Sequence, residues 1–82
     1  MEKTAVYPGS FDPITNGHLD LLERGLKIFD KIVIAIAANP GKNPVFTLQE
    51  RIDLIKESIK GHPLERRVQV DAFHGLLVDY VK

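Results

Sequence analysis

The run Ile32-Val33-Ile34-Ala35-Ile36-Ala37-Ala38 is the strongest indication of the fold class, because it is apolar at every position and rich in β-branched residues. A strand with one face in water alternates apolar and polar side chains, whereas a strand that is buried on both faces reads as a continuous apolar run. The run therefore predicts a buried strand in a parallel sheet that helices cover.

Two further strands are predicted on either side of this run. Residues 4–7 (Thr-Ala-Val-Tyr) form a short β-prone segment, and we expect Pro8-Gly9 to stop it. Residues 67–73 alternate apolar and polar side chains, which is typical of a half-buried strand near a sheet edge.

The segments between the predicted strands have the periodicity of amphipathic helices. From about Asn16, apolar residues recur at helical spacing, namely Leu19, Leu22, Leu26 and Phe29. Thr47 opens a second helix with Glu50 as its capping-box partner, and Gly61-His62-Pro63 ends it; its apolar stripe is Leu48, Ile52, Ile55 and Ile59. A further amphipathic segment runs from Gly75 to the last residue. The order β-α-β-α-β-(α) predicts an α/β fold with a Rossmann-like, doubly wound parallel sheet, in one domain over residues 1–82.

Composition excludes several classes of protein. The chain has 82 residues, with 11 Lys+Arg against 11 Asp+Glu, so it has no basic excess for tight non-specific binding of nucleic acid. It has no cysteine, which excludes disulfides and thiolate metal sites. Its apolar runs are far shorter than a membrane span, and its first residues lack the apolar stretch of a signal peptide. We expect a cytoplasmic protein that does not bind a membrane.

Ligands of an open parallel sheet bind where the carboxyl ends of the strands meet, and this rule selects the candidate loops. The loops on that side are residues 8–15, 39–46 and 73–75, whereas Asp30-Lys31 and residues 61–66 lie on the opposite side and are expected to be structural. The first loop carries Gly9 and Ser10 and leads into a helix that starts near Gly17. Free N–H groups at a helix start favour an anion such as phosphate. The alternative is that both glycines only serve tight turns.

His18 and Lys42 are the candidate charged or polar partners of that anion. His18 lies in the first turn of the first helix and Lys42 lies on the second loop, so an anion could meet one from each side. The alternatives are a solvated or core histidine and a solvated lysine. His62 is on the opposite side, and His74 is on the ligand side without a partner in the sequence. No spacing of His, Asp and Glu indicates a metal site, and no P-loop motif is present.

Three segments resemble the phosphopantetheine adenylyltransferases, a family within the nucleotidyltransferases that share an H-x-G-H element. Residues 7–18 (YPGSFDPITNGH) resemble the opening signature, with Thr15-Asn16-Gly17-His18 as the T-x-G-H form of that element. Residues 42–51 (KNPVFTLQER) resemble the K-x-P-x-F segment and its helix-opening E-R. Residues 75–80 (GLLVDY) resemble the G-L-L-x-D-[YF] motif.

The resemblance implies a reaction and a role for each matching residue. The adenylyl group of ATP would pass to 4′-phosphopantetheine, giving dephospho-coenzyme A and pyrophosphate. His18 would stabilise the transition state, and Ser10 and Lys42 would hold the attacking phosphate. Gly9, Ser10, Phe11, Gly17 and His18 would contact ATP, Leu77 would contact the pantetheine arm, and Mg²⁺ would arrive with ATP.

The resemblance also implies that the chain is shortened on its C-terminal side, because members of the family are considerably longer. Full-length members form homo-oligomers (hexamers). In the sheet order of the family the first strand is central, so here its bare edge is expected to cause self-association.

Three other functions remain open at this point. The acceptor could be another phosphorylated compound, the chain could be a non-catalytic phosphate- or nucleotide-binding half-domain, or it could be a minimal α/β scaffold without a function of its own.

Overall fold

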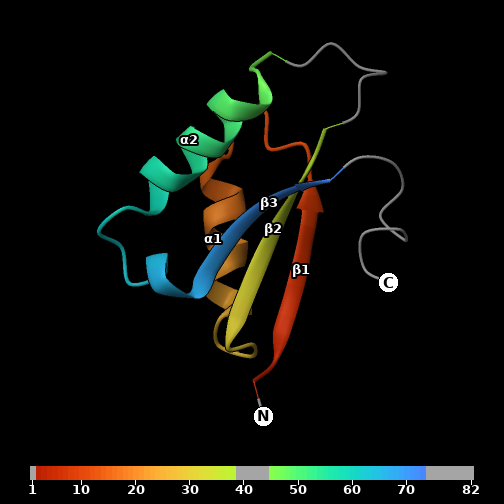
Figure 1. Ribbon diagram of the computed structural model, residues 1–82. Helices are drawn as coiled ribbons and strands as arrows, with labels where there is room; N and C mark the ends of the chain where they lie inside the picture. The colour runs from red at the N-terminus through yellow and green to blue at the C-terminus, as the bar shows by residue number, and fades with distance from the viewer. Residues whose placement is uncertain (1, 39–44, 74–82) are drawn as a thin grey trace.

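The computed structural model describes residues 2–38 and 45–73, which form a parallel sheet with helices between the strands (Figure 1). The strands β1 (Thr4–Gly9), β2 (Lys31–Ala37) and β3 (Val68–Phe73) lie in the order β1-β2-β3. Helix α1 (Asn16–Gly25) connects the first pair, and helix α2 (Leu48–Ile59) connects the second. The predicted α/β fold class is confirmed, while the predicted segment 75–82 lies outside the described residues.

Strand β2 is the buried strand that the sequence predicts. Residues 32–36 are all buried, and β2 pairs with β1 on one side and with β3 on the other. Strand β3 pairs only with β2 within the described residues, and most of its side chains are half-buried. The prediction of a half-buried strand near an edge is therefore confirmed.

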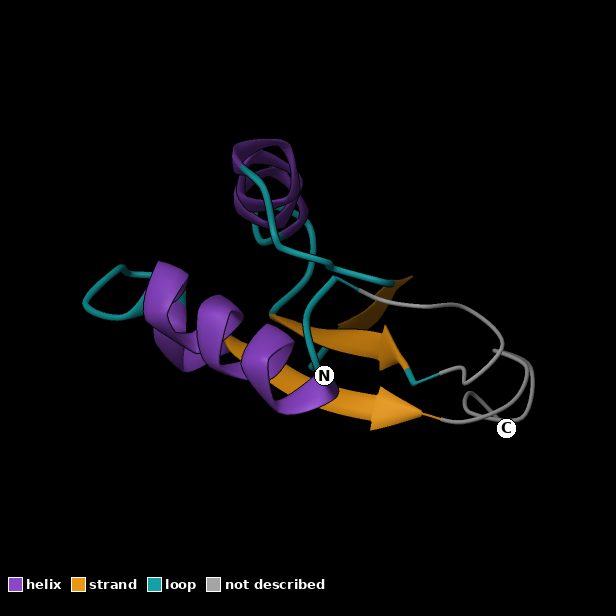
Figure 2. Cartoon of the chain, turned by 90° about the horizontal axis from the view of Figure 1, so that it is seen from above, coloured by secondary structure: helices purple, strands orange, loops and turns teal. Residues whose placement is uncertain are grey.

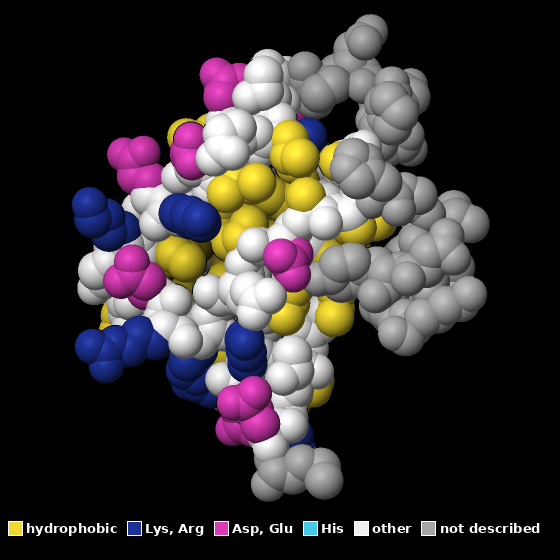
Figure 3. All heavy atoms as spheres, viewed as in Figure 1, with side chains coloured by type: hydrophobic (Ala, Val, Ile, Leu, Met, Phe, Trp, Pro, Cys, Tyr) yellow, Lys and Arg dark blue, Asp and Glu magenta, His cyan; other side chains and the backbone are white. Residues whose placement is uncertain are grey.

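Both helices cover the same face of the sheet (Figure 2). Leu22 of α1, Ile55 of α2 and Ile34 and Ile36 of β2 are fully buried in one apolar cluster. Each such side chain contributes about 1.5–3 kcal/mol relative to exposure. In Figure 3 apolar side chains gather near the centre of the view, where α2 meets the sheet, and charged side chains border them.

Two predicted boundaries are wrong by more than one residue. Strand β1 continues through Pro8 and Gly9, which pair with Ala35 and Ile36 of β2. Proline lacks an N–H group but is tolerated in a strand that pairs on one side only, which is the situation of β1 within the described chain.

Helix α1 ends at Gly25, although the apolar periodicity extends to Phe29. Lys27 and Ile28 donate to the carbonyl groups three residues back, which tightens the chain into turns. Beyond the end of the helix, the Arg67 guanidinium donates to the carbonyl oxygens of Leu26 and Phe29 at 2.7 and 2.9 Å. Arg67 ends a 3-10 turn (Glu65–Arg67) that the sequence did not reveal.

Within the described residues, no helix is both long enough and apolar enough to cross a membrane.

Candidate functional site

The loop from Ser10 to Thr15 connects the carboxyl end of β1 to the start of α1, at the edge of the sheet that the sequence selects (Figure 1). Phe11 has a φ of 47°, a left-handed conformation that non-glycine residues rarely adopt, and its ring is buried. The ring packs edge-on against Tyr7, with centroids 5.1 Å apart. Burial raises the pKa of the Tyr7 hydroxyl, so this side chain stays neutral near neutral pH.

Gly9 is required by this packing. A Cβ atom on Gly9 would lie 2.9 Å from Cε2 of the Phe11 ring, which is closer than real Cβ atoms approach. Gly17 differs, because a Cβ there would meet only the Thr15 hydroxyl at 3.6 Å, an ordinary contact. The described chain therefore explains Gly9 by packing, and it leaves the space beside Gly17 open.

His18 is held by a capping box at the start of α1. The Thr15 N–H donates to His18 Nδ1 at 2.9 Å, and the His18 N–H donates to Thr15 Oγ1 at 3.3 Å. A backbone N–H can only donate, so Nδ1 is the acceptor and the neutral ring carries its proton on Nε2. The ring also lies against Phe11, with centroids 4.8 Å apart. Within the described residues Nε2 has no hydrogen-bond partner, which leaves it as a fixed donor.

Asp12 ties this loop to the start of α2, a contact that the sequence analysis missed. Its Oδ2 accepts from the Val45 N–H at 2.6 Å and its Oδ1 accepts from the Phe46 N–H at 2.8 Å. Thr47 and Glu50 then form the predicted capping box of α2, which is confirmed. Each oxygen of the Asp12 carboxylate thus accepts one backbone N–H.

Arg51 is the second residue that the sequence analysis missed, since it entered only as part of a matching motif. Its side chain is 5% exposed, and Nη1 donates to the carbonyl oxygens of Ser10 at 2.9 Å and Ala37 at 3.2 Å. Nε is buried without a partner in the described residues. Arg51 stands out because it is a charged residue that is buried, and burial can be seen in the structure but not in the sequence.

The predicted site residues fall into two groups. The structure brings Gly9, Ser10, Phe11, Gly17 and His18 to one side of the sheet: they lie at the end of β1, in the loop that follows it and at the start of α1. Lys42 and Leu77 lie outside the described residues, as does His74. The expected meeting of Lys42 with Ser10 and His18 therefore stays a prediction.

Metal-ligating side chains do not gather in the part of the chain that is described: no group of at least three His, Asp or Glu residues could hold an ion there.

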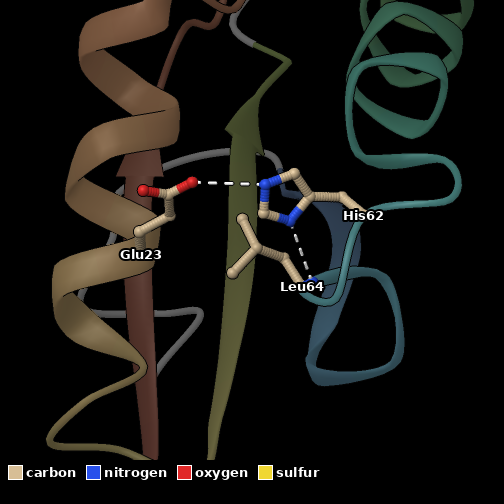
Figure 4. Close-up of polar contacts among 3 residues, drawn as sticks. All are labelled: Glu23, His62 and Leu64. Carbon is tan, nitrogen blue, oxygen red and sulfur yellow. Dashed lines mark hydrogen bonds and ion pairs between the residues drawn. The ribbon is translucent and has the colours of Figure 1, made fainter.

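At the amino ends of the strands, a second histidine is held in place by hydrogen bonding. His62 Nδ1 accepts from the Leu64 N–H at 3.2 Å, and Nε2 lies 3.2 Å from a carboxylate oxygen of Glu23 in α1 (Figure 4). This histidine therefore joins α1 to the turn after α2. The prediction that residues 61–66 are structural agrees with these contacts.

A parallel sheet with a loop and a helix start at the carboxyl ends of its strands is the α/β arrangement in which ligands bind at that side of the sheet. The chain belongs to the cytidylyltransferase-like family, whose sequence profile matches residues 6–79.

Two curated relatives of the chain carry the same name. The chain is 54% identical over 80 residues to a phosphopantetheine adenylyltransferase of Carboxydothermus hydrogenoformans, and the match covers 98% of the chain and 48% of that protein. It is 56% identical over 80 residues to the protein of the same name from Syntrophotalea carbinolica, covering 98% and 46%. The chain thus spans about half the length of the curated relatives it matches. The resemblance found in the sequence is confirmed.

Solved structures share the fold. A bifunctional NMN adenylyltransferase/ADP ribose pyrophosphatase from Francisella tularensis, in complex with AMP and a manganese ion, superposes with a TM-score of 0.75 at 22% identity. A second structure of that bifunctional protein gives a TM-score of 0.78 at 22% identity. Both matches cover 92% of this chain and 23% of the other, and at this identity they establish the Rossmann-like fold alone.

Proposed function

We propose that this chain supplies the adenylyl-transferring half of an enzyme that converts ATP and 4′-phosphopantetheine to dephospho-coenzyme A and pyrophosphate. The names of the relatives and their identity over nearly the whole chain support the proposal. The structural observation that carries it is the Thr15–His18 capping box, which fixes an imidazole Nε2–H donor at the start of α1. Such a fixed donor is suited to stabilise charge that develops on a phosphoryl oxygen.

The reaction needs positioning more than acid–base chemistry. An oxygen of the acceptor phosphate attacks the α-phosphorus of ATP, a new P–O bond forms, and the bond to the bridging oxygen breaks. The electron pair of that bond leaves with pyrophosphate. Since the attacking oxygen is already anionic, no general base is required. The described site agrees with this, because His18 is held by Thr15 and is not paired with a carboxylate.

Each remaining residue has a proposed role on one side of the reaction. Ser10 and Lys42 hold the acceptor phosphate, and Leu77 contacts the pantetheine arm. Gly9, Ser10, Phe11 and Gly17 form the ATP side through their backbone. The open space beside Gly17 supports this assignment, because a phosphate there can approach the N–H groups of the helix start closely.

Mg²⁺ enters this proposal as part of the substrate, bound to the phosphates of ATP. Asp12 is the carboxylate of the loop, and its oxygens already accept from Val45 and Phe46. The ion would therefore be held by phosphate oxygens and water, as Mg²⁺ commonly is in nucleotide sites.

Release of pyrophosphate tests the proposal. The 82-residue chain and the complete product of its gene are each incubated with MgATP and one phosphorylated acceptor, either 4′-phosphopantetheine or nicotinate mononucleotide. We expect the complete protein to release pyrophosphate with phosphopantetheine alone. Release with the other acceptor only contradicts the proposed substrate, and binding of ATP by calorimetry without any release indicates a non-catalytic nucleotide-binding protein.

A further inference from the structure

We propose that Thr15 is a positioning residue for the transfer reaction: it keeps His18 neutral, with the ring proton on Nε2, and so keeps the ring a hydrogen-bond donor. This inference rests on the proposed function, in which His18 stabilises charge on the phosphoryl group that is transferred. It adds a residue to that function, because the roles implied by the resemblance include His18 but not Thr15.

Thr15 makes three contacts with His18, and two of them end on the imidazole ring. Its N–H donates to His18 Nδ1 at 2.9 Å, and its Oγ1 lies 3.0 Å from the same nitrogen. The third contact is the usual one of an N-cap residue, in which Oγ1 accepts from the His18 N–H at 3.3 Å.

The start of α2 shows what helix capping alone requires. The Thr47 N–H donates to Glu50 Oε1 at 2.8 Å, and the Glu50 N–H donates to Thr47 Oγ1 at 3.1 Å. These two reciprocal bonds complete a capping box. The contact between the Thr15 hydroxyl and the ring of His18 has no counterpart among the contacts described for Thr47, so capping does not account for it.

These contacts define where the hydrogen atoms lie. Nδ1 of His18 accepts the Thr15 N–H and therefore carries no proton. A hydrogen between Oγ1 and Nδ1 can then come only from the hydroxyl, which donates to the ring while its lone pairs accept the His18 N–H. A proton on Nδ1 would face both donors. Because the other neutral tautomer and the imidazolium both carry that proton, the Thr15 contacts oppose both of them.

Aromatic packing holds the plane of the His18 ring. The buried ring of Phe11 lies against it with centroids 4.8 Å apart, and the ring of Tyr7 lies at 6.0 Å. A ring that is bound at Nδ1 and packed against Phe11 presents its Nε2–H in one direction. A donor that is fixed before the substrate binds needs no reorganisation when charge develops in the transition state.

Carboxylates do not favour a charged His18 in the part of the chain that is described. An adjacent carboxylate would favour the imidazolium. The Asp12 oxygens accept from the backbone of residues 45 and 46, and Asp20 pairs with Arg24 at 3.0 Å. Burial raises the pKa of the Tyr7 hydroxyl, so this neighbour adds no negative charge near neutral pH. Control of the ring proton is therefore left to Thr15.

NMR of the ring nitrogens of His18 tests this inference, because it reports which nitrogen carries the proton. It is recorded on the ligand-free, complete gene product at about pH 8, above the usual titration range of histidine. In Thr15→Asp the N-cap is kept, but an ionised carboxylate can only accept, so it draws a proton onto Nδ1. Thr47→Asp makes the same change at α2 and is the matched control. His62, whose Nδ1 accepts from the Leu64 N–H, is an internal reference in every spectrum.

We expect only the Nε2–H tautomer of His18 in the unsubstituted protein and in Thr47→Asp, and a proton on Nδ1 in more than about half of the Thr15→Asp molecules. If Thr15 served only to cap α1, the ring of Thr15→Asp would keep its tautomer, because aspartate caps a helix at least as well as threonine. That result, or a proton on Nδ1 in the unsubstituted protein, would overturn the proposal.

Turnover of the complete gene product with MgATP and 4′-phosphopantetheine connects the ring to the reaction. Thr15→Val removes the hydroxyl and should lower kcat by about 10-fold or more while the KM for ATP stays within about 3-fold, because the donor is misdirected rather than lost. Thr15→Ser restores the hydroxyl and should recover most of the turnover. Thr47→Val also loses an N-cap and should keep kcat, so equal losses of kcat in the two valine variants contradict the positioning role.

The two measurements separate this inference from the proposed function. If the unsubstituted protein transfers nothing to phosphopantetheine, the proposed function fails, and the NMR comparison of Thr15→Asp with Thr47→Asp alone decides whether Thr15 keeps His18 neutral. If transfer occurs and Thr15→Val retains full kcat, the proposed function stands and the positioning role of Thr15 fails.

Discussion

At the carboxyl ends of the strands His18 is locked by the Thr15 N–H, and at the amino ends His62 is locked by the Leu64 N–H, so both rings carry their proton on Nε2. The difference lies in what Nε2 meets. That of His62 faces the Glu23 carboxylate at 3.2 Å, whereas that of His18 has no partner within the described residues. The same side chain closes a structural contact at one edge of the sheet and stays available at the other.

Arginine and aspartate repeat this contrast. Arg67 donates to three carbonyl oxygens where α1 ends, and Asp30 accepts from the Lys3 N–H at 2.7 Å, so both complete the amino edge. Arg51 and Asp12 use the same kinds of bond at the carboxyl edge, but they join the two loops that carry candidate site residues. Similar hydrogen bonds therefore join the turn after α1 to its surroundings at the amino ends of the strands, and join the loop after β1 to the start of α2 and the end of β2 at the carboxyl ends.

Replacing the two histidines should have different consequences for turnover. We expect His18→Ala to lower kcat of the complete protein by about 10²–10³-fold with a much smaller loss of ATP affinity, because the Nε2–H contact strengthens in the transition state. His62→Ala should leave kcat unchanged and cost at most about 1 kcal/mol of stability, as expected for an exposed pair. Pre-steady-state turnover and ATP calorimetry measure both quantities, and equal losses of ATP binding and turnover in His18→Ala would contradict the assigned role.

The two edges should also differ in their lysines. Lys42→Ala is expected to raise the KM for phosphopantetheine by about 10–100-fold with ATP affinity retained, because an ammonium that pairs with the acceptor phosphate is lost. Lys60→Ala removes an equal charge at the exposed end of α2 and serves as the control. Acceptor titrations at saturating ATP measure the effect. An unchanged acceptor KM in Lys42→Ala removes this residue from the site.

The two arginines should differ in their contribution to the free energy of unfolding. Arg51→Met leaves two partly buried carbonyl groups without their donor, and we expect it to cost about 1–3 kcal/mol in urea unfolding. Arg67→Met frees carbonyl groups that water can reach more readily, so we expect less than about 1 kcal/mol. A larger loss for Arg67→Met would show that the amino edge is the more costly one to open.

The sequence predicts local features of this molecule and misses the contacts that join distant segments. The buried run of β2 and the Thr47–Glu50 capping box follow from periodicity and from a known residue pattern. The Thr15 capping box escapes that pattern because histidine occupies the position that glutamate or glutamine usually fills. Asp12 and Arg51 reach partners that lie 14–41 residues away, and no local pattern reports such contacts.

The side of β1 that is unpaired within the described residues gives a further contrast, since it runs along the strand and lies at neither the carboxyl nor the amino ends of the strands. Val6 and Leu21 are 38% and 53% exposed, and a hollow of about 200 Å³ runs beside them along the strand. We predict that the 82-residue chain self-associates there and that Val6→Lys weakens association by about 10-fold or more, because a lysine at an edge strand opposes pairing. Ile28→Lys alters an exposed apolar residue at the amino edge and is the control. Sedimentation velocity measures both, and equal effects would point to general apolar contact instead.

The smallest expected effect comes from the glycines at the two ends of α1. Gly17→Ala meets no close atom and should raise the free energy of unfolding by about 0.5–1 kcal/mol, since alanine is the better helix former. Gly25→Ala places its Cβ 2.8 Å from Cδ1 of the buried Ile32, so that side chain must shift and the helix gain is offset.

Stabilisation by bound ATP should favour the opposite variant: Gly25→Ala should keep it and Gly17→Ala should lose part of it. If a phosphate approaches the N–H groups beside Gly17, the added methyl group lies in its path, and the rise in melting temperature that MgATP produces should shrink in Gly17→Ala but persist in Gly25→Ala. Thermal melts at several ATP concentrations measure this difference. A Gly17→Ala protein that is more stable and still gains the full shift from ATP would place the nucleotide elsewhere on the carboxyl edge, and the open space beside Gly17 would then need another occupant.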